Sequence, residues 1–251
     1  MPNPFSLEGK VAIVTGGNEG LGRGLAMALA EAGADIACVS RRAPDETERA
    51  VKAIGRRFLA IQADLASIEP IPRIIEQTLG ALGGLDILVN NAGIIRRADA
   101  VDFSEADWDD VMNVNLKSAF FLAQAAGKHF IAQGRGKIVN IASMLSFQGG
   151  IRVASYNASK SGIAGVTKLL ACEWAGKGVN VNAIAPGYMA TDNTAPLRAD
   201  EKRNTEILAR IPAGRWGDPG DLGGAAVFLS SAASDYLHGA IIPVDGGWLA
   251  R

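Results

Sequence analysis

A tyrosine and a lysine four residues apart, Tyr156 and Lys160 in SYNASKSG, begin a stretch whose composition predicts a helix. Residues at this spacing lie on one face of a helix, so a phenol and an ammonium group are neighbours there. Such a pair can perform acid–base chemistry, although an isolated pair of this kind is more often a solvated surface feature. Its meaning depends on what else lies nearby.

Two further polar residues occupy unexpected positions. Ser143 directly follows the apolar run KIVNIA, which predicts a buried strand, and ligands of open α/β sheets bind beyond the carboxyl ends of the strands. Asn115 lies within a predicted helix, in VMNVNLKS, although asparagine is a poor helix former. Both positions favour a role at a site over a purely local structural role.

A glycine-rich turn lies near the start of the chain, in VTGGNEGLG. It follows the apolar run KVAIVT and precedes an alanine- and leucine-rich stretch, which together predict strand, turn and helix. Gly16, Gly17, Gly20 and Gly22 give T-G-x-x-x-G-x-G, a spacing that departs from the commoner G-x-G-x-x-G. Either spacing allows the backbone to approach a pyrophosphate, whose charge the helix amides stabilise. A tight connection without a ligand is the alternative.

The elements that must position these residues alternate along the chain. Strand patterns recur at 10–15, 36–40, 58–63, 86–90, 137–142, 179–185 and 240–244. Helical patterns occupy 45–55, 67–81, 107–133, 155–176 and 220–231. This alternation predicts an α/β Rossmann-type doubly wound fold with a seven-stranded parallel sheet, in a single domain spanning 1–251. The stretch 187–219, which holds three prolines, is predicted to be a long loop with a little helix that acts as a substrate lid.

Composition excludes several classes of function. The net charge is −1, from 25 basic and 26 acidic residues without blocks of like charge, so we expect no nucleic-acid or membrane partner. Cys38 and Cys172 form no recognisable metal or disulfide pattern, which favours the cytoplasm. His129 and His238 stand alone, so no metal site is expected.

Taken together, these motifs resemble the short-chain dehydrogenase/reductase family across essentially the whole chain. TGGNEGLG resembles the family's cofactor turn, NNAG (90–93) its characteristic strand end, and PGYMAT (186–191) its nicotinamide segment. Asn115, Ser143, Tyr156 and Lys160 match its catalytic tetrad. The resemblance implies a dinucleotide held by Gly16, Asn18, Gly20, Leu21, Gly22, Ser40, Arg41, Asp64, Leu65, Asn91, Ala92, Gly93, Tyr156, Lys160, Pro186, Gly187, Met189 and Thr191.

The family mechanism suits these residue types. Tyr156 would exchange the proton of the alcohol, and a nearby Lys160 is expected to lower its pKa by favouring the phenolate. Ser143 would hydrogen-bond the developing oxyanion, and Asn115 would hold a water that links Lys160 to solvent. The cofactor supplies the hydride chemistry.

Other stretches resemble one subgroup of that family, whose members act on sugar acids. They include AGIIRRADA (92–100), RIPAGRWG (210–217) and VDGGWLAR (244–251). The resemblance implies oxidation at C5 of 2-dehydro-3-deoxy-D-gluconate, or of gluconate as in neighbouring subgroups. A carboxylate substrate needs a cation, and the candidates in order are Arg152 and Arg97, followed by Arg96 and Arg215. Gln148 and Tyr188 are further substrate candidates, and Trp216 is a weaker one. Surface solvation or subunit ion pairs are the alternative role of each arginine.

Cofactor choice depends on the end of the second strand, CVSRR. An acidic residue there would bind the ribose 2′-hydroxyl, but Ser40 occupies the position and Arg41 and Arg42 follow. These arginines favour NADP(H) slightly over NAD(H). Glu19, in the glycine turn, argues for NAD(H).

Other functions remain open at this stage. A 3-oxoacyl-carrier-protein reductase is a second enzyme hypothesis, and a non-catalytic dinucleotide-binding sensor or scaffold belongs to another class. The intact tetrad argues against a sensor. The resemblance also implies a homotetramer, with 107–133, 155–176 and the C-terminal segment at its interfaces.

Overall fold

The computed structural model describes residues 3–251. Seven parallel strands form one sheet in the order β3-β2-β1-β4-β5-β6-β7. Their bounds are β1 Val11–Thr15, β2 Asp35–Ser40, β3 Phe58–Gln62, β4 Ile87–Asn90, β5 Gly136–Ile141, β6 Val179–Pro186 and β7 Ile241–Val244. Strand order reverses between β1 and β4, as in a doubly wound sheet. The predicted Rossmann-type fold and its seven strands are confirmed.

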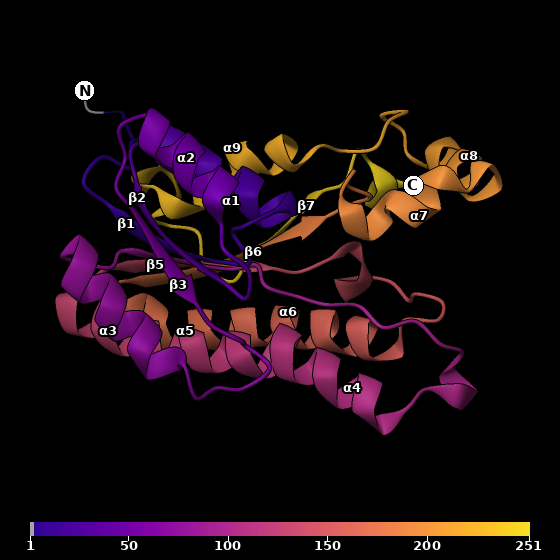
Figure 1. Cartoon of the computed structure of the whole chain (residues 1–251), viewed down its shortest axis with the longest axis horizontal. Helices are drawn as coiled ribbons and strands as arrows, with labels where there is room; N and C mark the ends of the chain where they lie inside the picture. Colours follow the sequence, from indigo (N-terminus) through magenta and orange to yellow (C-terminus); the bar gives the residue numbers. More distant parts are fainter. Residues whose placement is uncertain (1–2) are drawn as a thin grey trace.

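Helices cover both faces of the sheet (Figure 1). One face carries α1 Gly20–Glu31, α2 Asp45–Ala53 and α9 Gly223–Ser230. The other carries α3 Ile71–Leu82, α4 Glu105–Met112, α5 Ser118–Gln133 and α6 Ala154–Trp174. Within residues 3–251, no helix combines the length and the apolar composition that a membrane crossing requires.

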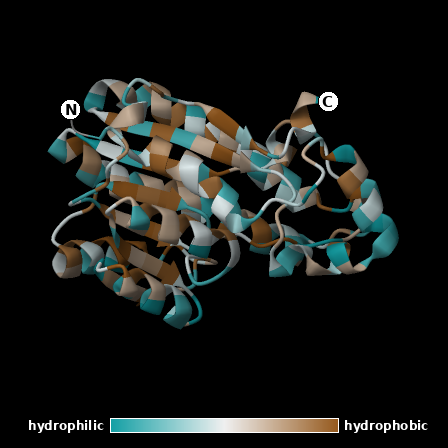
Figure 2. Cartoon of the chain, turned by 90° about the horizontal axis from the view of Figure 1, so that it is seen from above, coloured by the Kyte–Doolittle hydropathy of each residue, from teal (hydrophilic) through white to brown (hydrophobic). Residues whose placement is uncertain are grey.

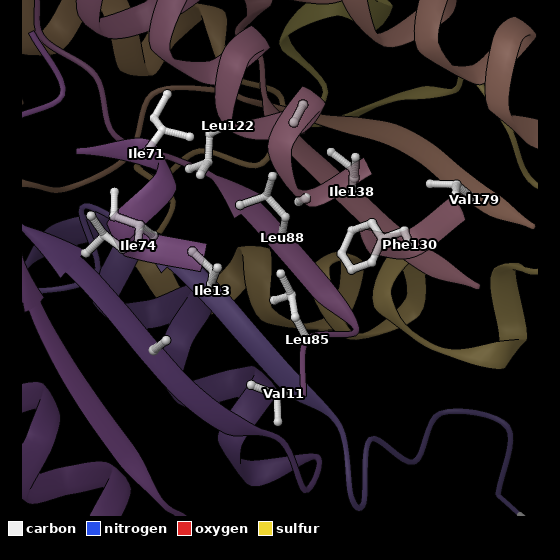
Figure 3. Packing of buried hydrophobic residues seen from close by; sticks show 14 of the residues in the cluster. Val11, Ile13, Ile71, Ile74, Leu85, Leu88, Leu122, Phe130, Ile138 and Val179 are labelled. Atoms are coloured by element: carbon white, nitrogen blue, oxygen red, sulfur yellow. The ribbon is translucent and has the colours of Figure 1, made fainter. Parts of the chain in front are cut away.

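The core explains why the strands read as continuous apolar runs. All five residues of β1 are buried, and alternate side chains point to opposite faces, Val11 and Ile13 to one and Ala12 and Val14 to the other. Figure 3 shows the first of these faces, where side chains from four strands pack with residues of α3 and α5. The cluster is centred on Val11, Ile13, Ile71, Ile74, Leu85, Leu88, Leu122, Phe130, Ile138 and Val179.

Two predicted helices differ from the structure, one at its start and one in its interior. The helix predicted over 67–81 begins only at Ile71, because Pro70 restricts the preceding backbone and suits the start of a helix. The helix predicted over 107–133 is α4 and α5 joined by a π-helical turn, Asn113–Lys117, in which Ser118 N donates to the Asn113 carbonyl five residues back. Such turns interrupt helices frequently at functional sites.

The stretch 187–219 contains more helix than predicted. It includes α7 Ala195–Ala199, which has a proline in its first turn, and α8 Glu201–Arg210, which is capped by the Asp200 carboxylate on Arg203 N. Figure 1 shows both helices at the carboxyl-terminal ends of β6 and β7, beside the C-terminus. In Figure 2 this end of the molecule carries many hydrophilic residues, whereas the strands are mostly hydrophobic. Segment 187–219 is therefore a small helical layer beside the strand ends. It is called the lid below, after its predicted role, which stays a prediction.

Candidate active site

The glycine turn forms a cradle between β1 and α1. Gly16 has φ 65°, and a Cβ on Gly22 would lie only 2.0 Å from the Gly16 carbonyl oxygen, so both positions require glycine. Among the residues that the structure describes, no side chain caps the first turn of α1, which leaves its amide groups available for an anion. A Cβ on Gly20 would lie 3.7 Å from the Thr191 side chain, so the turn faces the segment after β6. These features suit a dinucleotide pyrophosphate.

Thr15 and Asn91 fasten this turn to the end of β4. The Thr15 hydroxyl accepts from Asn91 N and Ala92 N, both at 2.9 Å. The Asn91 side-chain amide donates to the Thr15 carbonyl at 2.9 Å and to the Gly16 carbonyl at 3.4 Å. The NNAG segment and the glycine turn are thus one hydrogen-bonded unit.

Thr47 supports the same turn and was not predicted. It is fully buried on α2, and its hydroxyl donates to the Gly17 carbonyl at 2.9 Å and to the Asn18 carbonyl at 3.4 Å. Thr47 follows PDE in the sequence and carries no local signal that links it to a turn 30 residues earlier.

The predicted adenine-side residues lie around the ends of β2 and β3. Ser40 is buried and its hydroxyl donates to the Arg42 carbonyl at 2.7 Å, so it holds the loop that carries the two arginines. Leu65 is buried, while the exposed Asp64 accepts from Ala66 N at 2.9 Å.

Two oppositely charged residues near this loop form an ion pair. Arg42 pairs with Glu19 of the glycine turn, and Arg41 is exposed with no side-chain partner within residues 3–251. The Glu19 charge, which in the sequence argues against a 2′-phosphate, is therefore balanced by Arg42.

Ser143, Tyr156 and Lys160 come together at the end of β5. Ser143 is buried, and its hydroxyl contributes a hydrogen bond that lowers the pKa of Tyr156. The Lys160 ammonium is buried, donates to the Ile141 carbonyl at 2.6 Å and lies 5.6 Å from the centroid of the Tyr156 ring. Tyr156 itself is half-buried. The four-residue spacing and the strand end therefore bring the three side chains to one place.

The pKa of Tyr156 departs from the prediction. Burial raises it, and this effect outweighs the lowering by the Ser143 hydroxyl and by the charge of Arg97. The net shift is therefore opposite in direction to the lowering that was predicted from Lys160. Burial instead lowers the pKa of the lysine itself from 10.5 to about 8.

Asn115 lies in the π-helical turn and holds the segment after NNAG. Its buried amide accepts from Ile94 N at 2.8 Å and donates to the Ile94 carbonyl at 2.9 Å and to Ser159 Oγ at 3.2 Å. The side chain thereby links the segment after NNAG to α6 at Ser159, which lies three residues after Tyr156 and directly before Lys160. The predicted water relay stays a prediction.

The arginines differ sharply in their surroundings. Arg152 pairs with Asp99 at 3.1 Å, is exposed, and has a left-handed backbone with φ 62°. Arg96 pairs with Asp107 and Asp110, and Arg215 forms two hydrogen bonds with Asp221.

Arg97 is the exception among the four. It has no acidic partner within residues 3–251, and its charge acts on Tyr156. The predicted preference for Arg152 over Arg97 stays a prediction. In the structure Asp99 pairs with Arg152, and Ala98 N donates to the Arg152 carbonyl, so these contacts fasten the 150–153 loop to the 97–99 segment.

Gln148 and Tyr188 belong to a cluster in which the loop after β5, the lid and the C-terminal segment meet. Tyr188 packs against Trp216 and Trp248, with ring centroids 5.4 and 4.8 Å away. The Gln148 side-chain oxygen accepts from Arg210 and Trp248. Neither Arg210 nor Trp248 was predicted from sequence, although Trp248 lies in a stretch that carries the subgroup resemblance.

The segment after β6 approaches the glycine turn. Pro186 ends β6, Gly187 N donates to the Val244 carbonyl at 2.9 Å, and Met189 is buried. Thr191 begins a short helical turn and faces Gly20. The segment predicted to contact nicotinamide thus lies across from the cradle.

Comparisons with known proteins agree with this geometry. A family model described as enoyl-(acyl carrier protein) reductase matches residues 16–249. The Escherichia coli protein named 2-dehydro-3-deoxy-D-gluconate 5-dehydrogenase is 65% identical over 248 residues, which cover 98% of each chain.

Solved structures are similar over the same length. A crystal structure from Agrobacterium tumefaciens with bound NADP, provisionally named a 2-deoxy-D-gluconate 3-dehydrogenase, is 61% identical, with a TM-score of 0.92 and coverage of 99% of this chain and 100% of that one. A gluconate 5-dehydrogenase from Burkholderia cenocepacia in complex with NADP and tartrate is 39% identical, with a TM-score of 0.94 and coverage of 99% and 98%.

Proposed function

The chain belongs to the short-chain dehydrogenase/reductase family, and we propose that it oxidises 2-dehydro-3-deoxy-D-gluconate reversibly at C5. The observation that supports alcohol–ketone chemistry is the meeting of Tyr156, Ser143 and Lys160 beside a cradle suited to a dinucleotide. The substrate is suggested by the name of the relative that shares 65% of its residues. Gluconate is a second candidate, favoured by the similar gluconate 5-dehydrogenase.

Tyr156 carries the proton in this proposal. Its raised pKa keeps the phenol protonated at neutral pH, so in the reducing direction it donates a proton to the ketone oxygen. The Ser143 hydroxyl donates a hydrogen bond to the same oxygen as negative charge develops there. In the oxidising direction Tyr156 first gives its own proton to solvent, for which the proposed water relay through Lys160 and Asn115 offers a route, and the resulting phenolate then takes the proton of the alcohol. The dinucleotide, when bound, accepts or delivers the hydride.

Lys160 and Asn115 support this centre. Lys160 places a cation against the Tyr156 ring and, through its bond to the Ile141 carbonyl, is anchored to the end of β5. Asn115 holds the 94–97 segment, and therefore Arg97, at the site. The proposed water relay through Asn115 is consistent with the interrupted helix around it.

Arg97 is proposed to bind the substrate carboxylate. Its guanidinium lacks an acidic partner within residues 3–251, and its charge lowers the pKa of Tyr156, so it is a cation without an acidic partner that acts on the reacting group. A charged fork is suited to a carboxylate. Gln148 and Tyr188, the latter a residue of the lid, are proposed to complete the substrate side.

NADP(H) is the proposed cofactor in preference to NAD(H). The Arg41 side chain is exposed just after β2 and has no partner within residues 3–251, and the Glu19 charge is balanced by Arg42. Both similar structures from Agrobacterium tumefaciens and Burkholderia cenocepacia hold NADP. The remaining predicted cofactor residues, from the glycine turn to Thr191, surround the same space and are proposed as contacts.

The assembly and compartment are further parts of the proposal. A homotetramer is supported by large apolar side chains exposed on α4, on α6 and before β7, namely Trp108, Leu169 and Tyr236. The cytoplasm is proposed because an exposed free thiol such as Cys172 persists best in a reducing compartment.

A substrate panel tests the function. The purified protein is assayed with 2-dehydro-3-deoxy-D-gluconate, gluconate, other hexonates, a neutral polyol and a 3-oxoacyl thioester, each with NAD⁺ or NADP⁺ in the oxidising direction or the reduced forms in the other. We expect the ketodeoxy acid to give the highest kcat/KM. A faster 3-oxoacyl thioester would contradict the proposal, and absence of turnover with every substrate would favour a dinucleotide-binding sensor.

A further inference from the structure

Trp248 is buried where residues 245–251 meet two segments that are far apart in the chain, the loop after β5 and the lid. It packs against Met144, just after Ser143, and against Ile207 and Ile211 of the lid. Its ring centroid is also 4.8 Å from that of Tyr188, in the segment after β6. The indole therefore lies in one cluster with the loop after β5 and with two parts of the lid, the end of α8 and the stretch after β6 that faces the cofactor cradle.

The C-terminal segment is fastened to the end of α8. The Arg210 guanidinium lies 4.0 Å from the centroid of the Trp248 ring, a geometry in which cation and ring attract. Arg251 donates to the Ala209 carbonyl at 3.2 Å. Residues 245–251 thus hold the lid through both a side-chain stack and a backbone contact.

The same two residues determine how the amide of Gln148 is oriented. Its oxygen accepts from Arg210 Nη2 and from Trp248 Nε1, each at 3.4 Å. Guanidinium and indole groups can only donate, so the amide oxygen must face them and the amide NH₂ must face away. Within residues 3–251 no protein group accepts from this NH₂, and it is not among the buried unpaired atoms. It is therefore a free donor, five residues after Ser143.

We propose that Arg210 and Trp248 are positioning residues that hold the Gln148 amide so that its NH₂ donates to a hydroxyl oxygen of the sugar acid. This inference rests on the proposed function, because a polyhydroxylated substrate supplies the acceptor. The donor is held in this orientation only while α8 and residues 245–251 are in place. Recognition of a substrate hydroxyl is consequently coupled to closure of the lid.

Conservative variants test the two positioning residues. Trp248→Phe keeps an aromatic ring, although a smaller one, and removes the indole N–H donor. Arg210→Gln removes the guanidinium cation. Each is expected to raise KM for the sugar acid by about 2- to 10-fold, as for one neutral hydrogen bond, with kcat little changed. Dinucleotide affinity, measured by fluorescence titration, should stay at the wild-type value. Arg203→Gln is the matched control, because Arg203 lies on the same helix but pairs only with Glu206.

Gln148→Glu removes the NH₂ donor but keeps the contacts with Arg210 and Trp248. The carboxylate still accepts from Arg210 and Trp248, but it has no NH₂ and repels an acid, so KM should rise more than in the other variants. Amide hydrogen exchange of the lid, measured on the ligand-free protein, should slow or stay unchanged in Gln148→Glu and accelerate in Trp248→Phe and Arg210→Gln.

Several results would overturn the inference. An unchanged KM in Gln148→Glu would show that the Gln148 NH₂ does not donate to the substrate. A loss of dinucleotide affinity that parallels the rise in KM shows that the cluster merely supports Tyr188 and the cofactor segment. If the wild type turns over no sugar acid, both the proposed function and the proposed role of the Gln148 NH₂ fail. If amide exchange of the lid in Trp248→Phe and Arg210→Gln equals that in Arg203→Gln, only the proposed positioning role of Arg210 and Trp248 is refuted.

Discussion

At the scale of single residues, Tyr156 is the group on which proton transfer depends. Tyr156→Phe removes the hydroxyl with almost no change in shape, so turnover is expected to fall by about 10²- to 10⁴-fold. Dinucleotide binding should change little, because the ring and its contact with Lys160 remain. Steady-state rates and fluorescence titration measure the two effects, and near-normal turnover would contradict the role of Tyr156.

The buried Lys160 makes stability depend on pH. Its pKa is about 8 in the folded protein and 10.5 when exposed, so between these values the unfolded chain binds more protons and the folded state gains stability as pH rises. Relative to Lys160→Met, the wild type should gain up to about 3 kcal/mol between pH 8 and 10.5. Urea unfolding at a fixed protein concentration measures this difference, and parallel pH profiles for the two proteins would refute it.

Arg97 and Arg152 differ in whether an acid already neutralises them. Arg97→Ala is expected to lower kcat/KM for the sugar acid by about 10- to 150-fold, the effect of losing one charge-assisted hydrogen bond. The rate with a neutral polyol should fall much less, and the Tyr156 pKa should rise because a stabilising charge is lost. Arg152→Ala, which breaks only an exposed ion pair, is the matched comparison and should have a small effect. Equal losses in the two variants would refute the assignment.

At the scale of elements, α2 supports the glycine turn through Thr47. Thr47→Val has nearly the same shape but leaves the Gly17 carbonyl without its buried donor, which should cost about 1–3 kcal/mol of stability. Dinucleotide affinity should weaken as well, since the turn is then less well held. Thermal unfolding and fluorescence titration test both effects, and a variant that keeps wild-type affinity would show that the turn is rigid without α2.

At the scale of the whole molecule, ligand binding should stabilise the folded chain. NADP⁺ at about 100 times its Kd contributes about 2.7 kcal/mol, whereas NAD⁺ at the same concentration should contribute less. Arg41→Ala should remove most of the difference between the two, because only NADP⁺ presents a 2′-phosphate. Thermal unfolding at one protein concentration measures these shifts. Equal stabilisation of the wild type by both dinucleotides would argue against a preference for NADP(H).

The sequence by itself determined the parts of this protein that depend on local physics. Continuous apolar runs predicted β1 and the other parallel strands, because strands covered by helices on both faces have no polar side. The spacing of Gly16 and Gly22 predicted the cradle, since a side chain there would collide with the neighbouring backbone. Tyr156 and Lys160 were predicted to be neighbours because a helix places residues four apart on one face.

Only the tertiary structure decided which charged side chains are paired with an opposite charge and how burial changes the pKa of the titratable groups. Asp99 neutralises Arg152 and Glu19 is balanced by Arg42, pairs that join residues far apart in the chain. The pKa of Tyr156 rises because the fold buries the phenol, an effect that no spacing of residues reveals. Coulomb energy and desolvation depend on distance and solvent access in space, so the choice of Arg97 and the packing of Trp248 on Arg210 required the folded chain.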